Sequence, residues 1–122
     1  MKTTRKYQPW NSKAQSWDYI ENRYLEDWKV RHSRLLELVR HIKNTDLKNR
    51  LFGSTSMDKL VVGIYDPLDY RKESLHITFD LSAKRWNFEY IAMPFDGPEF
   101  VRNYDEELGV EKFDSFINMI KW

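Results

Sequence analysis

The chain has 122 residues and a formal net charge of +1; 41% of its residues are hydrophobic, 16% aromatic and 32% charged. This length and composition predict one folded domain spanning residues 1–122 with its own hydrophobic core, and they exclude a disordered tail. The absence of cysteine excludes a disulfide scaffold, a thiolate nucleophile and a Cys-ligated metal site.

The first eleven residues are polar and basic. They include Pro9 beside Trp10, so residues 1–11 are expected to form an irregular arm. No apolar stretch follows this basic start, and the segment therefore predicts neither a signal peptide nor a membrane anchor. We expect a cytoplasmic protein that does not contact membranes.

A long amphipathic helical region follows the arm. Ser12 and Gln15 have the spacing of a capping box, which predicts that a helix begins at Ser12. One unbroken helix would be about 48 Å long, more than the width of a domain of this size. We therefore predict a break near Arg31–Ser33 and helices over residues 12–31 and 33–43, with a continuous helix as the alternative. Alternatively, the apolar stripe of the first helix could seal a homodimer. The apolar stripe of this region comprises Trp17, Ile20, Tyr24, Trp28, Leu35, Leu38, Val39 and Ile42.

The hydrophobic period changes to two in the second half of the chain. Residues 60–65 form an apolar, β-branched run, and residues 74–81 and 86–91 alternate between apolar and polar side chains. These three segments predict strands. Their short connections predict an antiparallel meander, because a parallel return would need a longer crossover.

The segments around these strands are less regular. Residues 47–52 allow a further helical turn, and the small residues 53–56 predict a turn ahead of the first strand. Residues 99–106 fit either a fourth, edge strand or an extended segment. The apolar spacing from residue 110 to residue 120 predicts a C-terminal helix.

Together these elements predict an α+β fold. N-terminal helices and a C-terminal helix would cover one face of an antiparallel, three- or four-stranded meander sheet, and the other face would remain in solvent. Truncation of Trp28 or Trp86 should be most damaging, at about 3–5 kcal/mol for a buried ring. The predicted core comprises Ile20, Tyr24, Trp28, Leu35, Leu38, Val39, Ile42, Leu60, Val62, Ile64, Leu75, Ile77, Phe79, Trp86, Phe88, Phe113, Phe116, Ile117 and Ile120.

The sequence predicts neither a metal ion nor a cofactor. His32 and His41 are nine residues apart in the helical region and stand on opposite sides of an ideal helix, while His76 belongs to a strand. The spacings HExxH and HxH do not occur. The segment Gly53–Ser56 lacks the further glycines and the lysine of a phosphate-binding loop.

A pair of carboxylates is the candidate for enzymatic chemistry. Asp80 and Glu89 fall on the same side of the predicted hairpin, and a turn at residues 82–85 would bring them nearly opposite each other. Two carboxylates at such a separation could share a proton, as in a small hydrolase. No nucleophile or oxyanion donor accompanies them at a recognisable spacing, so no catalytic residue is assigned.

Nucleic-acid binding is another alternative, because charge is distributed unevenly along the chain. Residues 1–52 contain 12 Lys or Arg and 6 Asp or Glu, whereas residues 53–122 contain 8 and 13. Tyr7, Trp10 and Tyr24 could stack on bases beside the cations of the basic half. Acidic residues are interspersed among these cations, and the net charge of the whole chain falls short of a strongly basic protein.

The acidic second half favours protein binding. Its carboxylates fall in loops and on the uncovered sheet face, where they would steer a basic partner while neighbouring aromatic residues anchor it. These aromatic residues are Tyr65, Tyr70, Phe95 and Tyr104. Immunity proteins that neutralise bacterial nuclease toxins are built in this way, and the chain is similar to them in charge and size. We therefore predict a non-enzymatic interaction module of immunity or inhibitor type. The predicted binding residues are Asp66, Asp69, Tyr70, His76, Asp80, Glu89 and Asp96.

Overall fold

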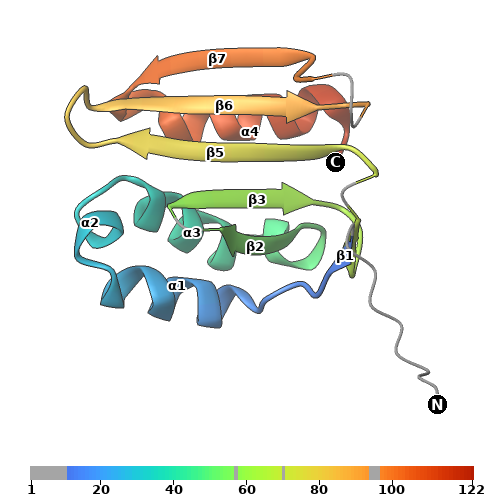
Figure 1. Ribbon diagram of the computed structural model, residues 1–122, viewed down its shortest axis with the longest axis horizontal. Helices are drawn as coiled ribbons and strands as arrows, with labels where there is room; N and C mark the ends of the chain where they lie inside the picture. Colours follow the sequence, from blue (N-terminus) through green and yellow to red (C-terminus); the bar gives the residue numbers. More distant parts are fainter. Residues whose placement is uncertain (1–10, 57, 70, 94–96) are drawn as a thin grey trace.

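A computed structural model gives the fold of residues 11–56, 58–69, 71–93 and 97–122. The fold is α+β, with N-terminal helices, a five-stranded antiparallel sheet and a C-terminal helix (Figure 1). The strand order β2-β3-β5-β6-β7 is that of a meander, as predicted, but the sheet has five strands instead of three or four. Its strands are β2 (Phe52–Ser56), β3 (Lys59–Gly63), β5 (Ser74–Asp80), β6 (Arg85–Ile91) and β7 (Phe100–Asp105). A separate two-stranded sheet pairs β1 (Asn11–Ser12) with β4 (Leu68–Asp69).

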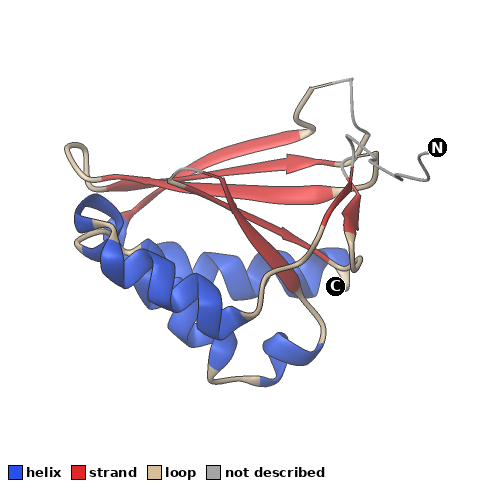
Figure 2. Cartoon of the chain, turned by 60° about the horizontal axis from the view of Figure 1, so that its bottom comes forward, coloured by secondary structure: helices blue, strands red, loops and turns tan. Residues whose placement is uncertain are grey.

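The helices pack on one face of the five-stranded sheet (Figure 2), which confirms the predicted layers. Since the described helices lie on this side, the opposite face of the sheet carries none of them. The helices are α1 (Trp17–Glu26), α2 (Trp28–Arg31), α3 (Leu35–Lys43) and α4 (Gly109–Ile120), with 3-10 turns η1 (Asp46–Asn49) and η2 (Glu106–Leu108).

The first helix begins later than predicted. Ser12 belongs to β1, and Ser16 caps α1 by accepting a hydrogen bond from the backbone N–H three residues on, at 3.0 Å. Gln15 is bound to β2: its backbone N–H donates to the carbonyl of Gly53 at 2.9 Å, and its side-chain oxygen accepts from the N–H of Thr55 at 2.9 Å. The predicted capping box is therefore wrong, because Gln15 forms its hydrogen bonds with strand β2 and not with the start of the helix.

The predicted break near Arg31–Ser33 is confirmed, and a second break occurs at Asp27. Asp27 ends α1 in an extended backbone conformation. Its carboxylate then caps α2 by accepting hydrogen bonds from the backbone N–H groups of Lys29 at 3.0 Å and Val30 at 3.2 Å. The helix axis thus restarts one turn before the predicted break.

This restart makes the prediction of Trp28 as a core residue wrong. The Trp28 side chain is 68% exposed, whereas Val30 is 2% exposed. The stripe of α1 ends at Asp27, so α2 begins with a new orientation and buries a different position. The Trp28 ring lies against His32 instead, with 4.8 Å between ring centroids. A truncation there would expose little new apolar surface.

Strand β2 occupies residues that were predicted to form a helical turn and a loop turn. Only Asp46–Asn49 of this region is helical, as a 3-10 turn. Helix α1 packs directly on the β2 backbone: a Cβ added to Gly53 would lie 2.6 Å from Cη2 of Trp17. A strand that needs small residues for this contact has no alternating apolar pattern, which is why the prediction failed. The open alternatives for residues 99–106 resolve in favour of a strand, β7.

The core lies between the helices and the sheet. Trp86 is fully buried, and its indole N–H donates to the carbonyl of Glu106 at 3.0 Å. Helix α4 begins against this ring, where a Cβ on Gly109 would collide with the indole. The predicted core is buried except for the exposed Trp28 and three residues that are partly buried against it, Ile64, Phe79 and Ile120.

Candidate functional site

The uncovered face of the sheet carries every second residue of the central strands. Strand pairing fixes which of them are neighbours across the sheet. The middle row combines apolar and polar side chains, and the rows toward the β5–β6 turn are polar or charged. The middle row is Ser54, Val61, His76, Glu89 and Val101; beside it lie Thr78, Asn87 and Asn103, and then Asp80, Arg85 and Asp105.

The aromatic rings of β6 and β7 lie on the helix-covered side. Phe88 and Tyr104 meet edge to face with 5.2 Å between centroids, and Tyr90 meets Phe116 of α4 at 5.2 Å. Tyr104 therefore packs within the fold and is not an anchor on the uncovered face, where it was predicted to assist binding.

His76 lies near the middle of the uncovered face. Its Nε2 is 3.0 Å from the hydroxyl oxygen of Ser74, and its partner across the ladder is Glu89. Burial lowers the pKa of His76, nearby Lys59 lowers it further, and Glu89 partly opposes both. The imidazole is consequently neutral at pH 7. Glu89 in turn accepts a hydrogen bond from the amide of Asn87 at 3.1 Å.

Asp80 and Glu89 share the uncovered face, as predicted, but they do not oppose each other. The register places Asp80 opposite Arg85 and Glu89 opposite His76. The two carboxylates are therefore four positions apart along the ladder, or about 13 Å. Asp80 Oδ1 accepts hydrogen bonds from the backbone N–H groups two and three residues on, at 2.9 and 3.0 Å. The predicted carboxylate pair is thus wrong, and the hydrolase alternative loses its acid–base centre.

The other predicted binding residues lie away from this face. Asp66 is exposed and Asp69 is half-buried in the connection between β3 and β5. An ion pair joins Asp69 to Arg71, with 2.9 Å between Oδ2 and Nη2, and hydrogen bonds from Arg71 lower the pKa of this carboxyl. Tyr70 and Asp96 lie outside the described residues. Of the predicted binding residues that the structure describes, only His76, Asp80 and Glu89 therefore share the uncovered face of the sheet.

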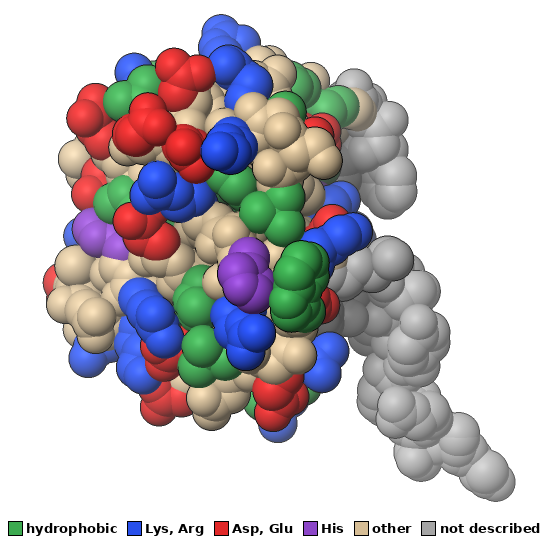
Figure 3. Space-filling view, turned by 90° about the vertical axis from the view of Figure 1, so that its left-hand side faces the viewer, with side chains coloured by type: hydrophobic (Ala, Val, Ile, Leu, Met, Phe, Trp, Pro, Cys, Tyr) green, Lys and Arg blue, Asp and Glu red, His purple; other side chains and the backbone are tan. Residues whose placement is uncertain are grey.

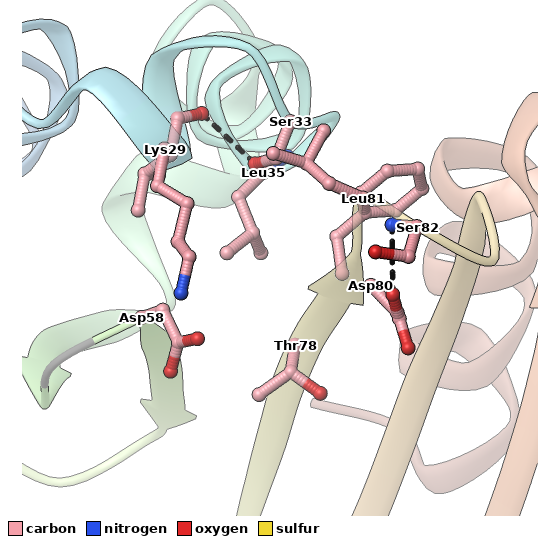
Figure 4. Close-up of a pocket in the computed structure, with 10 residues that line it drawn as sticks. Lys29, Ser33, Leu35, Asp58, Thr78, Asp80, Leu81 and Ser82 are labelled. Carbon is pink, nitrogen blue, oxygen red and sulfur yellow. Dashed lines mark hydrogen bonds between the residues drawn. The ribbon is translucent and has the colours of Figure 1, made fainter.

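A pocket opens where β5 continues beyond β3. Pairing between these strands stops at Leu60 and Ile77, and β3 itself begins at Lys59, so no strand of the described chain lies beside Phe79 and Asp80 on the edge away from β6. The cavity has a volume of about 350 Å³ and lies between α2, the turn after β2 and the end of β5 (Figure 4). We call it the β5 notch. Its polar lining residues are Lys29, Ser33, Asp58, Thr78, Asp80 and Ser82.

The charges of the β5 notch are incompletely balanced. Figure 4 shows the Lys29 ammonium group pointing toward the Asp58 carboxylate, yet no described cation lies within 4.0 Å of that carboxylate. Burial, and next the charges of Asp58 and Asp27, raise the pKa of the Tyr24 phenol. The Tyr24 hydroxyl is buried and has no hydrogen-bond partner within the described part of the chain. The negative charge of Asp58 thus acts on the interior as well as on the notch.

Trp28 projects from the same one-turn helix that lines the notch. The His32 ring is held beneath it by a hydrogen bond of 2.8 Å between Nδ1 and the Trp28 carbonyl. At this end of the molecule, acidic and basic side chains intermix and hydrophobic side chains lie between them (Figure 3). Sequence reasoning missed Lys29 and Asp58 as site residues; the available signal was the unequal length of β3 and β5, five and seven residues.

Comparison with known proteins does not add a functional assignment. No protein-family model, curated protein or solved structure matches this chain. Among the described residues, no group of three or more His, Asp or Glu side chains is arranged to hold a metal ion. None of the helices in the described ranges combines the length and the apolar character that crossing a membrane requires.

Proposed function

We propose that the protein is a non-enzymatic interaction module that binds a basic protein through the uncovered face of its sheet. The observation that supports this proposal is the one-sided packing of the fold: the helices cover one face (Figure 2), and on the other face β7 and the β5–β6 turn expose residues, although Ser54, Val61 and Ser74 are buried there. Val101, at 45% exposed, lies beside Glu89 on this face. A surface that mixes apolar residues and carboxylates suits a protein partner.

The balance of charge on this face favours a basic partner. The ion pair between Arg85 and Asp105, at 2.7 Å, neutralises one cation of the face. Asp80 and Glu89 remain without a described side-chain cation in an ion pair. Lys59, which opposes Ser56 at the start of β3 on the same face, is the remaining base. An excess of carboxylates steers an oppositely charged protein and raises its association rate. Immunity or inhibitor action toward a basic toxin is the biological role that we propose for such binding.

The proposal is tested by capture and by affinity measurement. The full chain is immobilised and used to capture proteins from its host, in parallel with Glu89→Lys on the sheet face and Glu111→Lys on the first turn of α4. The captured protein is then purified and titrated against each variant at low and high salt. We expect the affinity to fall at least tenfold for Glu89→Lys, to remain within twofold for Glu111→Lys, and to weaken with salt. Capture that is equal for both variants, or the absence of a specific partner, would refute the proposal.

A further inference from the structure

The β5 notch exposes backbone as well as side chains. Because β5 extends past the first residue of β3, the edge at Phe79 and Asp80 faces the cavity without a described strand partner. An uncovered strand edge offers carbonyl groups that accept hydrogen bonds from a ligand. The cavity volume of about 350 Å³ is near the lower limit for ligand pockets, so it suits a single side chain better than a cofactor.

The ionised groups of the notch leave one negative charge uncompensated. They are one cation, Lys29, and two carboxylates, Asp58 and Asp80. Arg85, the partner of Asp80 across the ladder, is bound to Asp105 instead. Asp80 Oδ1 is fixed by the turn backbone, and Oδ2 accepts no hydrogen bond from the described residues. A ligand with a single positive charge would therefore restore neutrality.

We infer that the β5 notch binds an arginine side chain of the basic partner. This inference takes the partner's charge from the proposed function, but the cavity and its carboxylates exist independently of that function. A guanidinium group has five N–H donors in one plane, which can reach the two carboxylates, the Thr78 hydroxyl and the β5 edge together. The methylene stem packs on the apolar wall formed by Val30, Leu35 and Leu81. A lysine ammonium group has three donors and a more strongly hydrated charge, so it matches the notch less well.

Trp28 extends this site to the outside of α2. Its ring is 68% exposed, and the Asp27 cap and the His32 hydrogen bond hold the short helix in place. A rigid, exposed tryptophan is the kind of residue that contributes most at protein interfaces, because little freedom is lost on binding. The partner segment that inserts its arginine into the notch covers this ring.

The inference is tested with a small probe before any partner is known. The ¹⁵N-labelled full chain is titrated with N-acetyl-arginine amide, and parallel samples receive N-acetyl-lysine amide, N-acetyl-norleucine amide or sodium acetate. We expect amide shifts at residues 78–82 and near Asp58 with the arginine probe, at millimolar affinity. Asp58→Asn should weaken this binding at least threefold, and Glu111→Gln, which changes an exposed carboxylate of α4 outside the notch, should leave it unchanged.

Three results would overturn the inference: no shift at these residues, an equal response to norleucine amide, or a stronger response to acetate than to arginine. Once a partner is captured, Asp58→Asn and Trp28→Ala separate the two proposals. Loss of partner binding with Glu89→Lys but not with either notch variant would refute the notch and leave the sheet-face function standing. Arginine binding in the notch without any specific partner would support the notch and refute the function.

Discussion

Replacing Gly109 by alanine sets two opposing effects against each other. Gly109 is the first residue of α4 and has ordinary helical dihedral angles, φ −58° and ψ −50°, so its backbone does not require glycine. Helix propensity alone would favour alanine by up to about 1 kcal/mol. The new Cβ, however, would collide with the indole of Trp86, a rigid ring that is fully buried and cannot move aside. Overpacking of this kind costs about 1–3 kcal/mol. We therefore expect Gly109→Ala to lower the free energy of unfolding by about 1–2 kcal/mol.

The explanation is checked with a double-mutant cycle. Trp86→Phe removes the indole nitrogen and the distal ring atoms that the new Cβ would meet. In that background Gly109→Ala should be neutral or stabilising, which corresponds to a coupling of about 1–3 kcal/mol between the two positions. Urea unfolding followed by circular dichroism measures all four proteins without relying on tryptophan fluorescence. An equal cost of Gly109→Ala in both backgrounds, or stabilisation in the wild type, would refute the reasoning.

Three further predictions, made with five substitutions, are tested by urea unfolding. Trp28→Ala should change the free energy of unfolding by less than about 0.5 kcal/mol, whereas Val30→Ala should lower it by about 1.5–3 kcal/mol. Equal costs would contradict the orientation of α2, in which Val30 faces the core and Trp28 faces solvent. Asp27→Ala should cost about 1 kcal/mol through loss of the cap, and Asp27→Ser should restore most of it. The folded state lowers the pKa of His76, so the unfolded chain takes up its proton first and stability falls as the pH drops below about 6.5. His76→Gln should reduce this dependence on pH. If the free energy of unfolding changes equally with pH in the variant and the wild type, the assignment to His76 is wrong.

In the helical half, the apolar pattern predicts the helices and their buried face but not the points at which a helix starts again. The existence of the helices, the covered face and the buried stripe follow from apolar spacing, which depends only on local geometry. The exposure of Trp28 does not follow from this spacing, because Trp28 continues the apolar stripe of α1 four residues after Tyr24. Only the cap at Asp27 shows that a new helix starts there. Ser12 and Gln15 fail for a related reason: the pattern matches a cap, but Gln15 binds β2, far away in sequence.

The sheet shows the same limit for pairing. Alternation correctly assigned His76, Asp80 and Glu89 to one face, because alternate residues of a strand point the same way. It could not fix which residues are opposite, since the register depends on the turn, and the observed pairing of Asp80 with Arg85 moves Glu89 away. The sequence of strand β2 has no alternation of apolar and polar residues, because α1 packs on its backbone and position 53 requires a small residue.

These failures coincide with the features that form the proposed site. The restart of α2 exposes Trp28 and brings Lys29 to the notch, and the start of β3 at Lys59 places Asp58 across from the unpaired edge of β5. A stable fold does not require any of these arrangements: a tryptophan on the stripe would bury more apolar surface, and a longer β3 would satisfy more backbone. Positions where local preference and the observed structure disagree are those at which function is expected to be placed. For this reason the notch and the exposed ring beside it, rather than the well-predicted core, are where the chemistry of binding is to be sought.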